Sequence, residues 1–102
     1  MIAIIDYGVG NLFSLASSLK SLGLETKVTR DAAAIRAADH IILPGVGAFA
    51  DAMAKLEATG LVPVIKQEVE HKPLLGICLG MQLLFEKSYE YGEHRGLGLI
   101  PG

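Results

Sequence analysis

The sequence is poor in the residues that build cross-links and metal sites. Cys78 is its single cysteine, and its three histidines lie far apart in the chain. One cysteine excludes a disulfide within the chain, and the four closely spaced ligands of a typical zinc site are missing. We therefore expect no metal and no cofactor, and we expect Cys78 to act as a free thiol.

Long apolar stretches and an excess of charge are also missing. The apolar residues come in short runs rather than one run of ~20, and the first residues lack the pattern of a signal peptide. Nine basic residues are scattered among eleven acidic ones, for a net charge of −2, which leaves no basic patch for nucleic acid or an acidic membrane. We expect a cytoplasmic protein with neither of these partners.

Short apolar segments alternate with segments of helical periodicity along the 102 residues, which suffice for one domain. Such alternation predicts an α/β fold, a parallel sheet flanked by helices on both faces and joined by right-handed crossovers. Polar residues alternate along the second predicted strand, which predicts a position at the edge of the sheet. The glycine-rich tail 92–102 offers at most one more short strand. The predicted strands are 2–5, 25–29, 41–43 and 74–77, and the predicted helices 12–22, 31–38, 48–58, 61–71 and 79–86.

The strongest local motif surrounds the cysteine. Residues 76–80 read Gly-Ile-Cys-Leu-Gly, the spacing of a nucleophile elbow with cysteine in place of serine. A sharp strand-to-helix turn needs nearly side-chain-free positions two residues before and after the nucleophile. The turn also places the thiol at a helix N-terminus, which favours the thiolate. A lone cysteine after an apolar strand can equally be a buried, inert residue.

A second glycine-rich segment, Pro44-Gly45-Val46-Gly47, follows the third predicted strand. Ligands of open α/β sheets bind beyond the carboxyl ends of the strands, so we expect this loop and Cys78 to share one crevice. Backbone N–H groups of Gly45, Val46 and Gly47 could then complete an oxyanion hole with that of Leu79. The alternative is an ordinary tight turn.

Three segments together resemble a known family. Residues 76–82 (GICLGMQ) are similar to the nucleophile signature of class I (triad) glutamine amidotransferases. Residues 6–12 (DYGVGNL) and 44–49 (PGVGAF) make the chain resemble the glutaminase subunits of imidazole glycerol phosphate synthases in histidine biosynthesis. The resemblance implies a flavodoxin-like half of such a domain, hydrolysis of glutamine to glutamate, and delivery of ammonia to a (β/α)8 cyclase subunit.

The same resemblance implies roles for individual residues. Cys78 would be the nucleophile, and Leu79 with residues 45–47 would supply the oxyanion donors. Gln82 would contact glutamine and Glu90 its amino group, although a surface helix and a charged loop explain these two residues as well. Asn11 would lie toward the synthase partner, although a helix N-cap explains it equally well.

The family's activating pair, a histidine and a glutamate two residues apart, has no counterpart in the chain. His40 and His71 precede strands at the amino edge of the sheet, which predicts solvated surface positions, and His94 follows a loop whose path the sequence does not predict. We therefore expect residues 1–102 to be the N-terminal part of a single domain that lacks its C-terminal half. Such a chain should be inactive alone and prone to self-associate through an exposed strand edge.

Two other functions remain open at this point. One is a glutamine amidotransferase of another pathway, such as anthranilate or pyridoxal phosphate synthesis, because the cysteine elbow is shared across the class; residues 6–12 argue against it. The other is a non-catalytic flavodoxin-like module whose motifs are inherited and idle.

Overall fold

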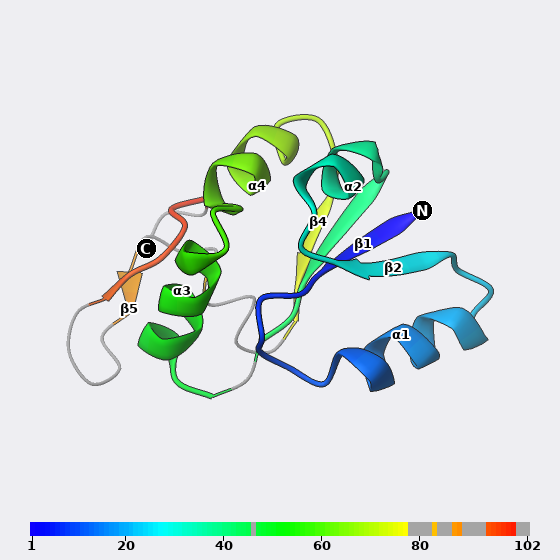
Figure 1. Ribbon diagram of the computed structural model, residues 1–102, viewed down its shortest axis with the longest axis horizontal. Coiled ribbons are helices and arrows are strands. Elements are labelled where there is room, and N and C mark those ends of the chain that lie inside the picture. Colours follow the sequence, from blue (N-terminus) through cyan, green and yellow to red (C-terminus); the bar gives the residue numbers. More distant parts are fainter. Residues whose placement is uncertain (46, 78–82, 84–86, 89–93, 100–102) are drawn as a thin grey trace.

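The computed structural model describes residues 1–45, 47–77, 83, 87–88 and 94–99 of the chain. Within these residues no helix is both long and apolar enough to span a membrane. The elements in chain order are β1 (Ile2–Ile5), α1 (Leu12–Ser21), β2 (Thr26–Thr29), α2 (Ala32–Ala37), β3 (His40–Leu43), α3 (Phe49–Ala58), α4 (Val62–Glu68), β4 (Leu74–Gly76), β5 (Lys87–Ser88) and β6 (His94–Arg95) (Figure 1).

Four strands form a parallel sheet in the order β2-β1-β3-β4. Ile4 of β1 is in register with Val28 of β2 and with Ile42 of β3, and Ile42 is in register with Leu75 of β4. Since all four strands are parallel, their carboxyl ends share one edge of the sheet. The parallel α/β fold is thus confirmed, and so is the outer position of the second strand.

One face of the sheet is closed by α2, α3 and α4. Alternate strand residues point into this side, because successive side chains of a strand face opposite ways. The buried cluster contains Ala3 and Ile5 of β1 and Ile41 and Leu43 of β3. The helices contribute fully buried side chains to it, namely Ile35, Phe49, Leu56 and Ile65. We call this side the closed face.

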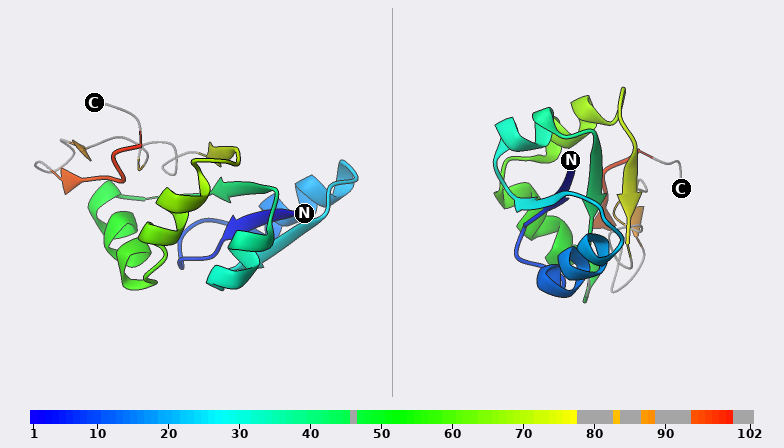
Figure 2. Two further views of the ribbon diagram at one scale, coloured as in Figure 1. Left: turned by 90° about the horizontal axis from the view of Figure 1, so that it is seen from above. Right: turned by 90° about the vertical axis from the view of Figure 1, so that its right-hand side faces the viewer.

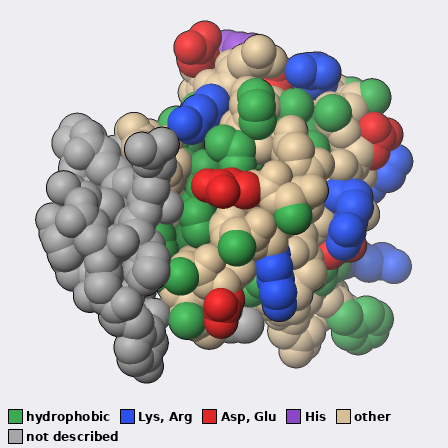
Figure 3. All heavy atoms as spheres, turned by 60° about the vertical axis from the view of Figure 1, so that its left-hand side comes forward, with side chains coloured by type: hydrophobic (Ala, Val, Ile, Leu, Met, Phe, Trp, Pro, Cys, Tyr) green, Lys and Arg blue, Asp and Glu red, His purple; other side chains and the backbone are tan. Residues whose placement is uncertain are grey.

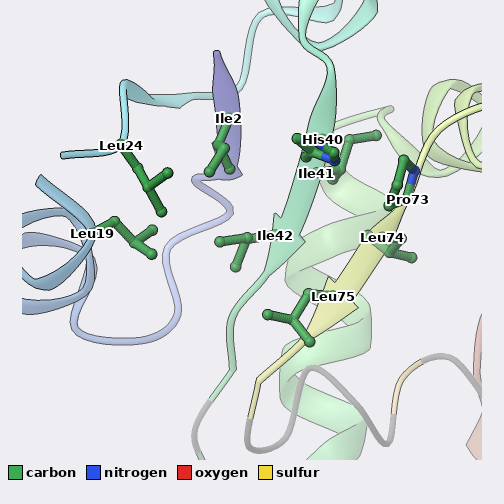
Figure 4. Close-up of a pocket in the computed structure, with 9 residues that line it drawn as sticks. All are labelled: Ile2, Leu19, Leu24, His40, Ile41, Ile42, Pro73, Leu74 and Leu75. Atoms are coloured by element: carbon green, nitrogen blue, oxygen red, sulfur yellow. The ribbon is translucent and has the colours of Figure 1, made fainter. Parts of the chain in front are cut away.

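The opposite side of the sheet, on which α1 lies, is not closed in the described part of the chain. In the view of Figure 1, α2 and α4 lie above the strands and α1 lies below them; Figure 2 shows the same layers from two further directions. A hollow of about 430 Å³ opens between α1 and the sheet. Figure 4 shows apolar side chains around it, and we call the following set the open face: Ile2, Leu19, Leu24, Ile42 and Leu75.

Helix α1 is amphipathic in sequence but has no buried residue in the structure. Leu75 of β4 is 57% exposed, and Phe13 at the start of α1 is 83% exposed. Within the described residues, the open face is therefore covered less completely than the closed face.

Most predicted boundaries are confirmed, and their causes are visible. Asn11 caps α1 by accepting from the Ser14 N–H at 3.1 Å, and Asp31 caps α2 by accepting from the Ala33 N–H at the same distance. Gly23 adopts φ of 80° after α1, a conformation that favours glycine as the helix stop. Pro63 lies in the first turn of α4, where its missing N–H costs no helical hydrogen bond.

Two boundaries differ from the prediction. Helix α4 ends at Glu68 rather than His71, and residues 69–72 form a turn in which the Lys72 N–H donates to the Glu68 carbonyl at 3.1 Å. The antiparallel ribbon of β5 and β6 was not predicted, since the expected tail strand was centred on Leu97 and Leu99. Two-residue strands are too short to show a period. The predicted helix 79–86 lies outside the described residues except for Leu83, which is buried.

A polar contact ties α4 to α2 on the closed side. Lys72 Nζ lies 2.8 Å from Glu68 Oε1 and donates to the carbonyls of Ile35 and Arg36, at 3.1 and 3.0 Å. These two carbonyls lie in the last turn of α2, where a cation is favourable. The hydrogen bond from Lys72 lowers the pKa of Glu68, despite the opposing effect of burial.

Candidate functional site

The candidate site lies at the carboxyl edge of the sheet, where the chain leaves β1, β3 and β4. Of the residues predicted to act there, the structure describes Asn11, Gly45 and Gly47. The other predicted site residues lie outside the described part of the chain: Val46, Cys78, Leu79, Gln82 and Glu90. Their roles stay predictions.

The approach to the cysteine is nevertheless described. The Ile77 N–H donates to the Leu43 carbonyl at 3.0 Å, which extends the β3–β4 ladder by one residue beyond β4. Leu43 directly precedes the Pro44 loop, and Ile77 directly precedes Cys78. The two motif-bearing segments therefore leave the sheet from neighbouring, hydrogen-bonded positions.

The loop after β3 begins buried and ends exposed. Pro44 and Gly45 are buried, whereas Gly47 is exposed and adopts φ of 88°. That left-handed conformation explains why glycine, rather than another residue, stands at position 47. Ala48 is the N-cap of α3 and makes no side-chain cap hydrogen bond.

The loop after β1 packs against the loop after β3. Tyr7 is only 3% exposed, and its hydroxyl donates to the Pro44 carbonyl. Gly10 lies on the same loop with φ of 100°, and a Cβ placed there would lie 3.4 Å from Pro44 Cβ and 3.8 Å from the Gly45 nitrogen. The two loops are thus in close contact. A hollow of about 210 Å³ beside them is lined by Gly8, Val9, Gly10, Gly47, Ala48, Asp51, Ala52 and Lys55.

Tyr7 was not predicted as a site residue. Its signal in the sequence was weak, because a tyrosine after an apolar strand has many possible surroundings. In the structure, burial raises the pKa of Tyr7 to about 12, so its hydroxyl keeps its proton at neutral pH and remains a donor. The charged neighbour Asp6 is bound locally: its Oδ1 accepts from the Gly8 N–H at 3.3 Å and lies 3.4 Å from an Arg30 nitrogen.

Asn11 lies in the same loop, and its side chain is used as the α1 N-cap. The residue is exposed, so a contact with a partner is sterically open, but the cap alone accounts for an asparagine at this position.

The histidines do not gather at this edge of the sheet. His40 is the first residue of β3 and is exposed, and His71 is 65% exposed and lies 3.5 Å from Glu68. Both were predicted as solvated positions at the opposite edge, which is confirmed. His94 begins β6, beside α3. Among the described residues, no cluster of three histidine, cysteine or acidic side chains could hold a metal ion.

The distribution of charged side chains on the surface shown in Figure 3 does not point to a binding site. On the face that Figure 3 shows, basic and acidic side chains are interspersed over the described surface. The described part of the candidate site is defined by backbone geometry at the strand ends, and the hollow beside its loops has one acid and one base in its lining, Asp51 and Lys55.

Comparison with known proteins covers nearly the whole chain. A family model described as "Glutamine amidotransferase class-I" matches residues 3–93. A solved structure described as "Crystal structure of glutamine amidotransferase" superposes with a TM-score of 0.80 at 24% identity, covering 98% of this chain and 53% of that one. At that identity, the superposition shows the fold alone.

Curated relatives are more similar in sequence, and three of them are named "Imidazole glycerol phosphate synthase subunit HisH". The Exiguobacterium sibiricum protein is 54% identical over 100% of this chain and 52% of its own length. The Aquifex aeolicus protein is 56% identical over 97% of this chain and 49% of its own. The Desulfitobacterium hafniense protein is 58% identical over 100% of this chain and 49% of its own length. The chain thus spans about half the length of these relatives.

Proposed function

Because this chain belongs to the class I glutamine amidotransferase family, we propose that Cys78 is the nucleophile of a glutaminase. Its thiolate attacks the side-chain amide carbon of glutamine, forming a C–S bond and a tetrahedral oxyanion. The C–N bond then breaks, ammonia leaves, and water hydrolyses the thioester to glutamate. The observation that carries this proposal is the bond between Ile77 and Leu43, which brings the two motif-bearing strand ends together.

The oxyanion donors in this proposal are backbone N–H groups. Leu79 would supply one from the start of the elbow helix, and Gly45, Val46 and Gly47 would supply the others from the adjacent strand end. The left-handed φ of Gly47 supports the proposal that this loop supplies donors, because such a conformation lets the backbone turn within few residues. Gln82 and Glu90 would contact the substrate, as the family resemblance implies.

We further propose that the chain works as the glutaminase part of an imidazole glycerol phosphate synthase in the cytoplasm. Relatives carrying that subunit name align with the whole chain or nearly all of it. Ammonia would pass to a (β/α)8 cyclase subunit, with the loop of Asn11 toward it. The names of these relatives favour this pathway over anthranilate or pyridoxal phosphate synthesis.

Residues 1–102 would then form the N-terminal part of one amidotransferase domain. The chain matches about half of each relative, and its sheet has an open face, which supports this division. Activation of the cysteine by a histidine and a glutamate would come from the other half. Without them, proton transfer to the departing ammonia loses a positioned group worth ~10²–10⁴ in rate.

Glutamine hydrolysis tests these proposals directly. The chain alone should release ammonia negligibly, whereas adding the C-terminal half of the Aquifex aeolicus relative and a cyclase subunit should restore turnover. Cys78→Ala should abolish it. Substantial turnover by the chain alone would refute the division into halves and direct attention to His94. No turnover by any docked combination would favour the non-catalytic module.

A chemical test examines the elbow separately. A glutamine-like alkylating agent should modify Cys78 faster at neutral pH than it modifies glutathione, because a helix N-terminus favours the thiolate. Circular dichroism would show that the chain is folded during the assay. A rate no higher than that of glutathione, in folded chain, would reject the elbow.

We also propose that the chain self-associates when nothing covers its open face. Leu75 lies on β4, one of the two outer strands of the described sheet, where a strand edge without a partner among the described residues adjoins exposed apolar side chains. Sedimentation velocity over a range of concentrations tests this proposal, and a compact monomer throughout would contradict it.

A further inference from the structure

We infer that Tyr7 is a positioning residue for the loop after β3: its hydroxyl holds the Pro44–Gly45 peptide, and with it the Gly45 N–H, one of the proposed oxyanion donors. The inference rests on the proposed function, because the donors matter only if Cys78 forms a tetrahedral oxyanion. It adds a residue from the loop after β1 to a site whose other proposed catalytic residues follow β3 and β4.

The contact is buried and joins two strand ends. Tyr7 and Pro44 are 37 positions apart in the chain, and the hydroxyl of one donates to the carbonyl of the other inside the protein. Both residues and Gly45 are buried, so water does not readily replace this bond. Burial keeps the Tyr7 hydroxyl protonated at neutral pH, as its raised pKa of about 12 indicates.

The bond orients a donor through peptide geometry. The carbonyl of Pro44 and the N–H of Gly45 belong to one planar peptide unit, so fixing the direction of the oxygen fixes that of the N–H. Gly45 is the first of the proposed oxyanion donors in this loop. A hydroxyl on the oxygen side therefore sets the direction of the Gly45 N–H.

The loop that carries Tyr7 also lies near this peptide at Gly10. A Cβ placed at Gly10 would lie 3.4 Å from Pro44 Cβ and 3.8 Å from the Gly45 nitrogen. Tyr7 and Gly10 of one loop therefore both lie close to Pro44 and Gly45. The aromatic ring of Tyr7 fills buried space that a phenylalanine ring would also fill, so packing does not account for the hydroxyl.

The test compares two reactions of Cys78 in the full 102-residue chain, followed by mass spectrometry. The p-nitrophenyl γ-ester of glutamic acid acylates the thiolate: a C–S bond forms, the C–O bond breaks and p-nitrophenolate leaves, through an oxyanion. Iodoacetamide alkylates the same thiolate by displacing iodide, without an oxyanion. The variant Cys78→Ala serves as the background control, because any acylation by the ester that it still shows must occur at other residues.

Tyr7→Phe should slow acylation at least about tenfold, a part of the ~10²–10³ that complete loss of an oxyanion donor costs. Alkylation should stay within about twofold. The control is Thr59→Val, beyond the other end of α3, which removes a hydroxyl that donates to the Leu56 carbonyl at 2.6 Å and accepts from the Leu61 N–H at 3.2 Å. This control should leave the ratio of the two rates unchanged.

A conservative replacement distinguishes positioning from packing. 4-Aminophenylalanine at position 7 restores a donor at the ring tip, and should recover most of the lost acylation. If Tyr7→Phe left the ratio of the acylation rate to the alkylation rate unchanged, the inference would be overturned and the proposed function would stay intact. Equal loss of both rates, with no recovery by the amino variant, would reduce Tyr7 to a structural role and overturn it too. A folded wild-type chain that is alkylated but never acylated would overturn the inference, whereas the proposed function would still be decided by glutamine turnover with the C-terminal half added.

Discussion

The two faces of the sheet are built from the same strands but have different degrees of closure. On the closed face, α2, α3 and α4 bury side chains such as Leu56 and Ile65 completely. On the open face, α1 lies beside the sheet without burying one of its own residues, and Leu75 remains 57% exposed. Apolar strand residues alone therefore do not close a core. A covering layer is also needed, and among the described residues helices cover one side of this sheet fully and the other side only in part.

Truncation of matched leucines measures this difference most directly. Leu56→Ala should lower the free energy of unfolding by about 2–5 kcal/mol, because it leaves a cavity in a closed core. Leu19→Ala, on α1 at the open face, should cost less than about 1 kcal/mol, since water already reaches the site. Urea denaturation of both variants gives the two values. Equal costs would mean that the open face is closed in solution.

Self-association gives a second measure of the open face. Leu75→Lys should weaken association about 10–100-fold, because burying a leucine contributes about 1.5–3 kcal/mol and the lysine adds a charge at a strand edge. Sedimentation equilibrium measures the change. The control is Val64→Ala on the closed face, which removes apolar volume without touching the edge. Unaltered association of Leu75→Lys would place the contact elsewhere.

The cap of α1 tests how far this poorly packed helix depends on local interactions. Asn11→Ala removes the acceptor for the Ser14 N–H and should cost about 1 kcal/mol. Asn11→Asp keeps the acceptor and should cost little. Helical content from circular dichroism, with thermal melting, measures both. If Asn11→Ala also lowered affinity for a cyclase subunit while Asn11→Asp did not, the cap rather than the amide would account for the effect.

The smallest expected effect concerns the polar tie between α4 and α2. The Lys72 hydrogen bond lowers the pKa of Glu68, so its stabilisation is present above the unfolded glutamate pKa of ~4.3 and is lost as pH falls through the lower folded value. Glu68→Gln should therefore be slightly less stable than the wild type at pH 7. The difference should shrink in thermal melts as the pH is lowered below ~4.3. A difference that stayed constant from pH 7 downward would contradict the charge as its cause.

Several features could be predicted because each depends on nearby residues. Local chemistry accounts for the strand at the apolar run 2–5, for the helix caps Asn11 and Asp31, and for the helix stop at Gly23. The structure shows each of them. Others could not be predicted. β5 and β6 are held by pairing across a loop, and Tyr7 acquires its partner only when two strands lie side by side.

The sequence by itself therefore determined the alternation of strands and helices, the helix ends and the family, because these follow from residue order and short-range contacts. The tertiary structure alone decided that Ile77 bonds to Leu43, that Tyr7 reaches Pro44, and that one face stays open. Each of these joins residues far apart in the chain or depends on which layer covers the sheet. The periodicity of a single segment contains no information about either.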